Sequence, residues 1–135
     1  MGCKTIARFT YDSATVEDAP ANLPIPLPNE TISTKCISSD GATISIRRPG
    51  AYLVLANFTF VATAAGAIES QMFRNGNAVL GMHAISTAAA AGDNVSQAYA
   101  QPITVGQNTG EVSINFKPVQ DTSVRVASVT IIKVA

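Results

Sequence analysis

The chain has 135 residues, a length that suits a single domain with its own hydrophobic core. Only 13% of the residues are charged and the formal net charge is zero. A neutral, charge-poor surface does not attract a phosphate backbone, so no nucleic-acid partner is expected. No apolar run approaches the roughly 20 residues that a membrane helix requires, so no membrane partner is expected either.

Residues 4–11 alternate between apolar and polar side chains, which predicts a first strand. The N-terminus lacks the continuous apolar segment of a secretory signal peptide, so folding in a cytoplasm is expected. In that compartment Cys3 and Cys36 are expected to be two reduced thiols.

Residues 19–28 read APANLPIPLP and contain four prolines, a composition that excludes a helix or a central strand. We expect an extended arm that lies over a surface. Leu23, Ile25 and Leu27 alternate with prolines, a spacing that suits a groove on a partner, and they are the predicted attachment residues. Residues 1–30 are accordingly predicted to form a first strand and an arm, and residues 31–135 the main domain.

Strand patterns dominate the remainder of the chain. The Asn75-Gly76 pair predicts a tight hairpin, because both residues tolerate a positive φ. The alanines at 88–91 are too few for a convincing helix and precede a Gly-Asp-Asn turn. Strands are predicted at residues 31–37, 42–47, 52–63, 68–74, 78–86, 95–105, 111–117 and 124–134. About nine or ten short strands without a helix predict an all-β, two-sheet antiparallel jelly-roll sandwich.

The strand that follows Pro49-Gly50 is apolar on both faces. One face carries Tyr52, Val54, Ala56, Phe58 and Phe60. The other carries Leu53, Leu55, Asn57 and Thr59. The first face can fill the core of one subunit, whereas the second is too apolar to remain in water. This pattern predicts another layer of protein, and a second copy of the same chain is the expected source.

Three segments resemble a known family when they are taken in order. PGAYLVLANFTF resembles the Gly-x-Tyr strand of the tumour-necrosis-factor-like jelly roll, which the complement globular heads share. QMFRNGNAV is similar to the Asn-Gly hairpin of that family, and ASVTIIKVA to its last, central strand. The resemblance covers roughly residues 31–135. It is closest to the bacterial and bacteriophage branch, which includes small virion proteins and the heads of collagen-like spore-surface proteins; the Pro-rich arm and the missing Gly-x-y stalk depart from the latter.

The resemblance implies a homotrimer. The family's core positions match one face of the strand after Pro49-Gly50, which leaves the alternate residues for the subunit contact. With the corresponding face of the last strand, the predicted trimer interface consists of Leu53, Leu55, Asn57, Ser128, Thr130 and Ile132.

Residue types that could carry catalysis are sparse. His83 is the only histidine and has no metal-ligand spacing to either cysteine, and no nucleophile or phosphate-binding motif occurs. We therefore expect no enzymatic activity, no cofactor and no metal. A calcium site in a loop would have to use isolated carboxylates from Asp40, Asp93 or Asp121. For glycan binding, Tyr11 and Tyr99 are the candidate stacking rings, with packing into the core as the alternative.

These observations predict a non-enzymatic, homotrimeric virion protein, either a capsid decoration or a head-fibre protein of a bacteriophage. It would be made in the host cytoplasm, reside in the virion and contact the major capsid protein or other virion proteins. The alternatives are a receptor- or glycan-binding head of a phage fibre, and a trimer on a bacterial spore or cell surface.

Overall fold

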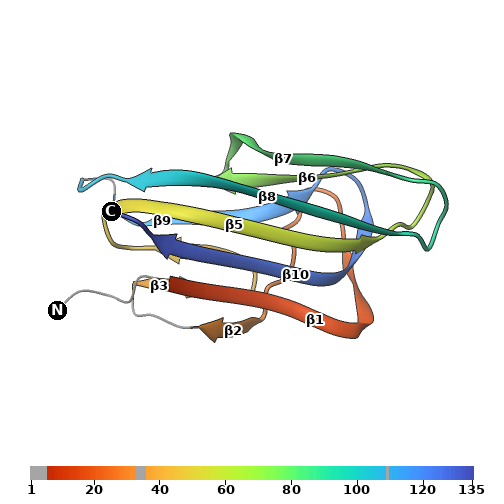
Figure 1. Ribbon diagram of the computed structural model, residues 1–135, viewed down its shortest axis with the longest axis horizontal. Coiled ribbons are helices and arrows are strands. Elements are labelled where there is room, and N and C mark those ends of the chain that lie inside the picture. The colour runs from red at the N-terminus through yellow and green to blue at the C-terminus, as the bar shows by residue number, and fades with distance from the viewer. Residues whose placement is uncertain (1–5, 33–35, 109) are drawn as a thin grey trace.

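The computed structural model describes residues 6–32, 36–108 and 110–135 of the chain. It is an all-β jelly roll, which confirms the predicted fold class (Figure 1). Across the described ranges no helix has the length and apolar character to span a membrane. The strands are β1 (Ile6–Ala19), β2 (Asn29–Ile32), β3 (Ile37–Ser39), β4 (Ile44–Ile46), β5 (Gly50–Val61), β6 (Gly66–Arg74), β7 (Asn77–Ala88), β8 (Asn94–Val105), β9 (Val112–Pro118) and β10 (Thr122–Lys133).

The strands form two antiparallel sheets that pack face to face. Sheet A has the order β2-β1-β10-β5-β8, and sheet B has the order β3-β4-β9-β6-β7. Strands β7 and β8 are the edge strands of different sheets and lie beside each other (Figure 1). The long strands β5 and β10 therefore lie inside sheet A, each with a neighbour on both sides.

The alternation predicted for the strand after Pro49-Gly50 is confirmed in β5. Its inward side chains, such as Tyr52 and Phe60, are buried, whereas Leu55 and Asn57 are exposed. The pairing of β5 with β10 and β8 aligns this alternation across the sheet. Sheet A thus has one face in the core and one face toward solvent.

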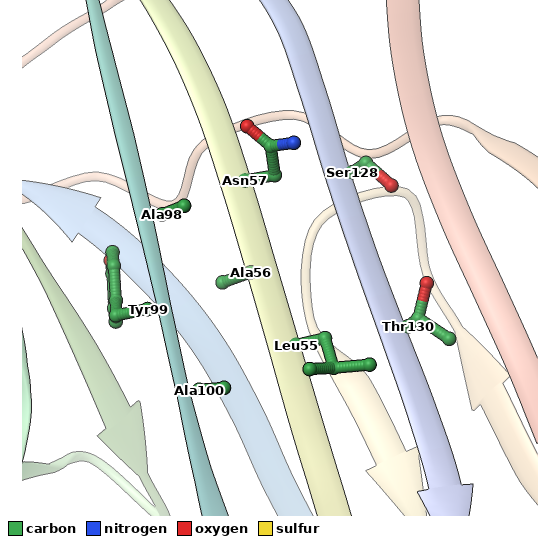
Figure 2. A pocket seen from close by; sticks show the side chains of 8 residues that line it. All are labelled: Leu55, Ala56, Asn57, Ala98, Tyr99, Ala100, Ser128 and Thr130. Carbon is green, nitrogen blue, oxygen red and sulfur yellow. The ribbon is translucent and has the colours of Figure 1, made fainter.

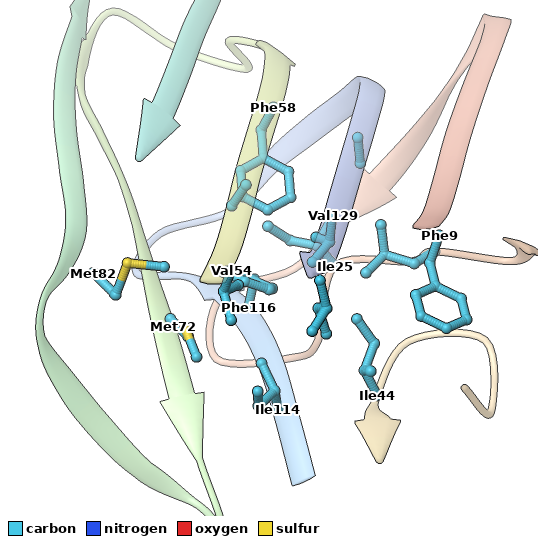
Figure 3. Close-up of a cluster of buried hydrophobic side chains, with 14 of the residues drawn as sticks. Phe9, Ile25, Ile44, Val54, Phe58, Met72, Met82, Ile114, Phe116 and Val129 are labelled. Atoms are coloured by element: carbon cyan, nitrogen blue, oxygen red, sulfur yellow. The ribbon is translucent and has the colours of Figure 1, made fainter. Parts of the chain in front are cut away.

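Aromatic and branched side chains from both sheets fill the space between them (Figure 3). The ring of Phe58 in sheet A lies 5.3 Å from the ring of Phe116 in sheet B and 5.7 Å from that of Phe60, measured between centroids. Met72 and Met82 are fully buried under the β6–β7 side of the core. Rings at these separations gain contact energy beyond the area that they bury.

The Asn75-Gly76 hairpin is also confirmed. It joins β6 to β7, with φ of +50° at Asn75 and +83° at Gly76. These are the positive values that a tight hairpin requires, and asparagine and glycine adopt them at low cost. The Asn75 side chain additionally accepts a hydrogen bond from the backbone N–H of Ser113 at 2.8 Å, which ties the turn to β9.

Two strand predictions were wrong in extent. The single strand expected at residues 31–37 is instead the end of β2 in sheet A and the beginning of β3 in sheet B. The first strand extends to Ala19 rather than stopping at residue 11. Its second half resumes pairing with β10 after a bulge between Asp12 and Glu17, and periodicity alone does not reveal such an irregularity.

The prediction of a surface arm for attachment was wrong at two of its three residues. Ile25 is 0% exposed and Leu27 is 1% exposed, and both belong to the core. Figure 3 shows Ile25 among the core side chains. Leu23 is exposed, as an attachment residue would need to be. The arm therefore contributes core volume, and Ile25 and Leu27 do not face a partner.

The arm lies along the part of β9 that β4 does not reach. The backbone N–H of Ile25 donates to the carbonyl of Phe116, and that of Leu27 donates to the carbonyl of Gly41, both at 2.7 Å. Pro24 and Pro26 occupy alternate positions, where no backbone donor is used. Residue 30 is therefore not a boundary between an arm and a domain, because the described N-terminal segment is built into the sandwich.

The expectation of reduced thiols was wrong for Cys36, which is disulfide-bonded. Cys3 lies outside the described residues, so the expectation that its thiol is reduced stays a prediction.

We predict that Ile25→Ala lowers the free energy of unfolding by about 2–5 kcal/mol, because it removes buried methyl groups and leaves a cavity in the core. The matched change Leu23→Ala is expected to stay within about 0.5 kcal/mol, because that side chain is exposed. Chemical denaturation of both variants measures the difference. Equal and small effects would show that the arm does not pack as described.

Candidate functional site

The candidate site is the part of the outer face of sheet A that β10, β5 and β8 form, three of its five strands. Cross-strand pairing sets the side chains of this face in rows. In one row Leu55 lies between Thr130 of β10 and Ala100 of β8. The neighbouring row consists of Ser128, Asn57 and Ala98.

These two rows surround an open depression of about 510 Å³ (Figure 2). Its lining consists of Leu55, Ala56, Asn57, Ala98, Tyr99, Ala100, Ser128 and Thr130. None of these residues carries a charge, and most are small. Small uncharged side chains on a flat sheet allow close approach of another protein surface without the cost of burying an ion.

All six residues predicted for the trimer interface lie on this face. They form three directly opposed pairs between β5 and β10: Leu53 with Ile132, Leu55 with Thr130, and Asn57 with Ser128. The structure therefore brings the predicted residues together, while their cover by another copy stays a prediction.

The predicted interface does not include β8. Ala98 and Ala100 of that strand line the depression, whereas all six predicted residues belong to β5 and β10. In the sequence these alanines alternate with Gln97 and Tyr99, which face the core, and this alternation indicates that the alanines lie on the outer face. What was lacking was the pairing, because sequence alone did not place residues 94–105 next to β5.

Charged side chains border this face on the side of β1. Arg8 pairs with Thr130 across β1 and β10, and its Nε donates to the hydroxyl of Ser128 at 3.3 Å. Asp12 lies opposite Val126 on the same border. The uncharged region is thus bounded by an arginine and an aspartate at the β1 side.

Tyr99, a candidate stacking ring for glycans, belongs to a buried polar network instead. Its hydroxyl lies 2.9 Å from the hydroxyl of Ser70, which donates to the side-chain carbonyl of Gln97 at 2.6 Å. The Gln97 amide donates to the backbone carbonyl of Ile68 at 2.8 Å. Burial raises the pKa of Tyr99 to about 12, and the hydrogen bond with Ser70 opposes that rise.

The second glycan candidate, Tyr11, is also packed. Its ring lies against the core, and its hydroxyl donates to the backbone carbonyl of Thr15 within the same strand. Both rings are partly buried and pack against the core, as the packed alternative predicts.

His83 is bonded to a neighbouring carboxylate. Its Nε2 lies 3.0 Å from Oε2 of Glu69 on the adjacent strand of sheet B. In the part of the chain that the structure describes, no cluster of three or more His, Cys, Asp or Glu side chains could hold a metal ion.

The three aspartates considered for calcium serve their own turns. Asp40 accepts hydrogen bonds from the backbone N–H groups of Ala42 and Thr43, and these bonds lower the pKa of its carboxyl group. Asp93 accepts a hydrogen bond from the N–H of Ala90 in the loop after β7. Asp121 accepts one from the N–H of Ala21, which links the arm to the β9–β10 turn.

Comparison with known proteins identifies the fold and nothing finer. No protein-family model matches the sequence, and no curated protein matches it. Among solved structures, Eiger TNF from S. frugiperda aligns with a TM-score of 0.73 at 10% identity, covering 97% of this chain and 92% of that one. Murine APRIL at pH 5.0 aligns with a TM-score of 0.68 at 11% identity, covering 96% and 99%.

The globular domain of the zebrafish complement 1qA protein is a third similar structure. It aligns with a TM-score of 0.57 at 11% identity, covering 95% of this chain and 94% of that domain. The likeness to the tumour-necrosis-factor and complement-head jelly rolls is therefore confirmed at the level of the fold. Identities this low carry no information about ligand or biological role.

We predict that Tyr99 makes folding sensitive to alkali. The pKa of Tyr99 rises to about 12 on folding. The protonated hydroxyl therefore contributes fully to the free energy of unfolding below the pKa of the unfolded chain, about 10, and this contribution is lost as the pH rises toward the pKa of the folded protein. Denaturation of the wild type and Tyr99→Phe at pH 9 to 12 (about one unit below to two units above that unfolded value) measures this loss. The variant should lose less stability than the wild type over this pH range. Some dependence of its stability on pH should remain, because the pKa of the buried Tyr52 is also raised. Identical slopes would contradict the burial of Tyr99.

Proposed function

We propose that this chain is a non-enzymatic structural subunit that associates with its own copies into a homotrimer through the outer face of sheet A. The observation that carries the proposal is the uncharged depression over β5, β8 and β10. It extends from the central strand β10 to the edge strand β8 of a sheet whose other face is already in the core. Small uncharged side chains in this position favour contact with another protein layer, because no ion has to be desolvated.

The energetics favour another protein layer over this face. Full burial of an exposed leucine contributes about 1.5–3 kcal/mol. Leu55 is 37% exposed and Leu53 is half-buried, so covering each of them contributes a fraction of that value. The polar members of the face, Asn57 and Ser128, lie opposite each other. They supply hydrogen-bonding groups that favour one alignment of the subunits over others.

The finer part of the proposal is that the trimer belongs to a bacteriophage virion, as a capsid decoration or head-fibre protein. The overall resemblance of the chain to the bacterial and bacteriophage branch of that jelly-roll family supports this part, as does the low charge of the chain. The partner would be the major capsid protein or another virion protein. The surface of this chain that contacts such a partner excludes Ile25 and Leu27, because both side chains are buried.

The virion role is tested on purified particles by quantitative mass spectrometry. A decoration protein is expected in a copy number comparable with that of the major capsid protein. A copy number as low as that of the portal or tail-tip proteins would contradict decoration and favour a receptor-binding head. Absence from the particle would contradict both.

For the trimer, we predict that Leu55→Asp yields a folded monomer. Three aspartates would come together in a dry interface, and burying each unpaired charge costs several kcal/mol. Light scattering of the wild type and the variant measures the mass, and circular dichroism checks the fold. Leu23→Asp is the matched control, because it makes the same change at another exposed leucine and should remain trimeric. A wild-type monomer, or a trimer with aspartate at position 55, would contradict the proposal.

A further inference from the structure

Charged side chains are distributed unevenly along the strands of the sandwich. Strand β5 runs from one end of the sandwich to the other, and its pairing identifies which segments share each end (Figure 1). The end at which β5 begins also holds the end of β10, because Tyr52 pairs with Lys133. The end at which β5 stops holds the start of β10, because Val61 pairs with Ser123.

Cations gather at the end where β5 begins, which we call the basic end. They belong to the β4–β5 connection and to the ends of β6 and β10: Arg47, Arg48, Arg74 and Lys133. The guanidinium of Arg74 donates to the carbonyl of Thr104, opposite the first residues of β5, at 2.6 Å. A Cβ at Gly50 would lie 2.8 Å from Cε of Lys133. The described carboxylate side chain at this end is Glu111, just before β9, so the cations leave a net positive charge there.

Carboxylates gather at the opposite end, which we call the acidic end. They belong to the end of β1, the β7–β8 loop and the β9–β10 turn: Glu17, Asp18, Asp93 and Asp121. The N–H of Ala62, directly after β5, donates to the backbone carbonyl of Asp93 at 2.9 Å. The N–H of Ala21, which follows β1, donates to the carboxylate of Asp121 at 2.8 Å. These bonds hold the three segments around the same end of β5.

Nearby cations do not pair with these carboxylates. Arg125 lies in β10 and Lys117 in β9, and across the described ranges neither forms an ion pair with them. The ammonium of Lys117 lies instead over the ring of Phe73, 4.7 Å from its centroid. The Nε of Arg125 is buried, with no acceptor in the part of the chain that the structure describes. The acidic end therefore keeps a net negative charge.

The acidic end contains an open pocket of about 230 Å³ between two of the carboxylates. Its lining consists of Asp18, Pro20, Thr63, Asp121 and Thr122, with no cation among them. Oδ1 of Asp121 accepts the N–H of Ala21, whereas Asp18 accepts no hydrogen bond from any described residue. Ionised carboxylates only accept hydrogen bonds, and their strongest partners are guanidinium and ammonium groups. The pocket thus suits an arginine or lysine side chain.

The basic end of the same chain is too distant to supply that side chain. Strand β5 has 12 residues and separates the two ends by about 40 Å at ~3.3 Å per residue. Salt screens charges beyond about 8 Å at physiological ionic strength, so the two ends do not neutralise each other. A second copy, however, presents the same cations at its own basic end. Both ends also lie outside the depression on sheet A, so a trimer formed there leaves them accessible.

We propose that the basic end of one copy docks on the acidic end of the next, with a guanidinium or ammonium group seated between Asp18 and Asp121. The inference goes beyond the proposed trimer and uses only the charge of the basic end, so contacts of its arginines within the chain stay in place. The contact is heterologous and joins opposite ends of the molecule, so repetition gives an open stack. In a stack of trimers, three such contacts would act together and reinforce one another.

The first experiment measures the mass of the wild type by light scattering at two ionic strengths. The screening length is about 30 Å at about 10 mM salt and about 8 Å at about 150 mM. We expect species heavier than the trimer at low salt, growing with protein concentration, and the trimer alone at high salt. A trimer at both ionic strengths overturns this inference and leaves the proposed function standing. A monomer at high salt that associates at low salt overturns the trimer and supports the end-to-end contact.

The second experiment compares Asp18→Lys with Glu30→Lys at the lower ionic strength. Both positions are exposed and both variants change the net charge equally, but Glu30 pairs with Phe9 midway along the sheet. Asp18→Lys should lose the heavier species, whereas Glu30→Lys should retain them, with circular dichroism confirming that both are folded. Equal behaviour of the two variants would show that net charge alone controls association, which overturns the assignment of the pocket.

The third experiment tests the basic end by complementation. Lys133→Glu alone should lose the heavier species at low ionic strength, as Asp18→Lys does. An equimolar mixture of the two variants should recover them, because the intact basic end of one meets the intact acidic end of the other. A mixture that stays at the mass of the separate variants, under conditions in which the wild type associates, overturns the end-to-end arrangement.

Discussion

Strand β5 pairs along its whole length with β8 on one side and with β10 on the other, and the remainder of the structure depends on that pairing. The register points Phe58 toward the ring of Phe116 in the opposite sheet, and it leaves Leu55 on the outer face. A shift of one residue would exchange the two sets of side chains, placing an aromatic row in water and leucines in a core shaped for rings. The same pairing therefore defines both the core and the candidate site.

Two further sets of contacts hold the two sheets together. Along the part of β9 that β4 does not reach, the Pro-rich arm supplies Ile25 to the core and uses alternate backbone donors as an incomplete strand would. At the β8 side, the hydroxyls of Ser70 and Tyr99 and the amide of Gln97 link sheet B to sheet A in a buried network. Such a network specifies one arrangement of the sheets, because a misaligned pairing would leave its polar groups buried without partners.

The surfaces that remain after this closure differ sharply in character. The outer face of sheet A is uncharged over its central strands and is bounded by Arg8 and Asp12 on β1. The outer face of sheet B carries the Glu69–His83 pair and Lys117, whose ammonium lies 4.7 Å from the ring centroid of Phe73. Because the residues that line the depression are uncharged, association through this part of sheet A requires little desolvation of ions.

The alternation of β5 and the Asn75-Gly76 turn are local properties, so the sequence by itself determined the long two-faced strand, its hairpin neighbour and the all-β class. It also determined that Leu53 and Leu55 share a face. The tertiary structure alone decided that Ile25 enters the core, because the usable donors of a Pro-rich segment depend on which carbonyls lie beside it. It likewise decided the irregular pairing of β6 with β7 between Gln71 and Phe73, since a bulge exists only relative to a partner strand, and spacing along one strand contains no information about that partner.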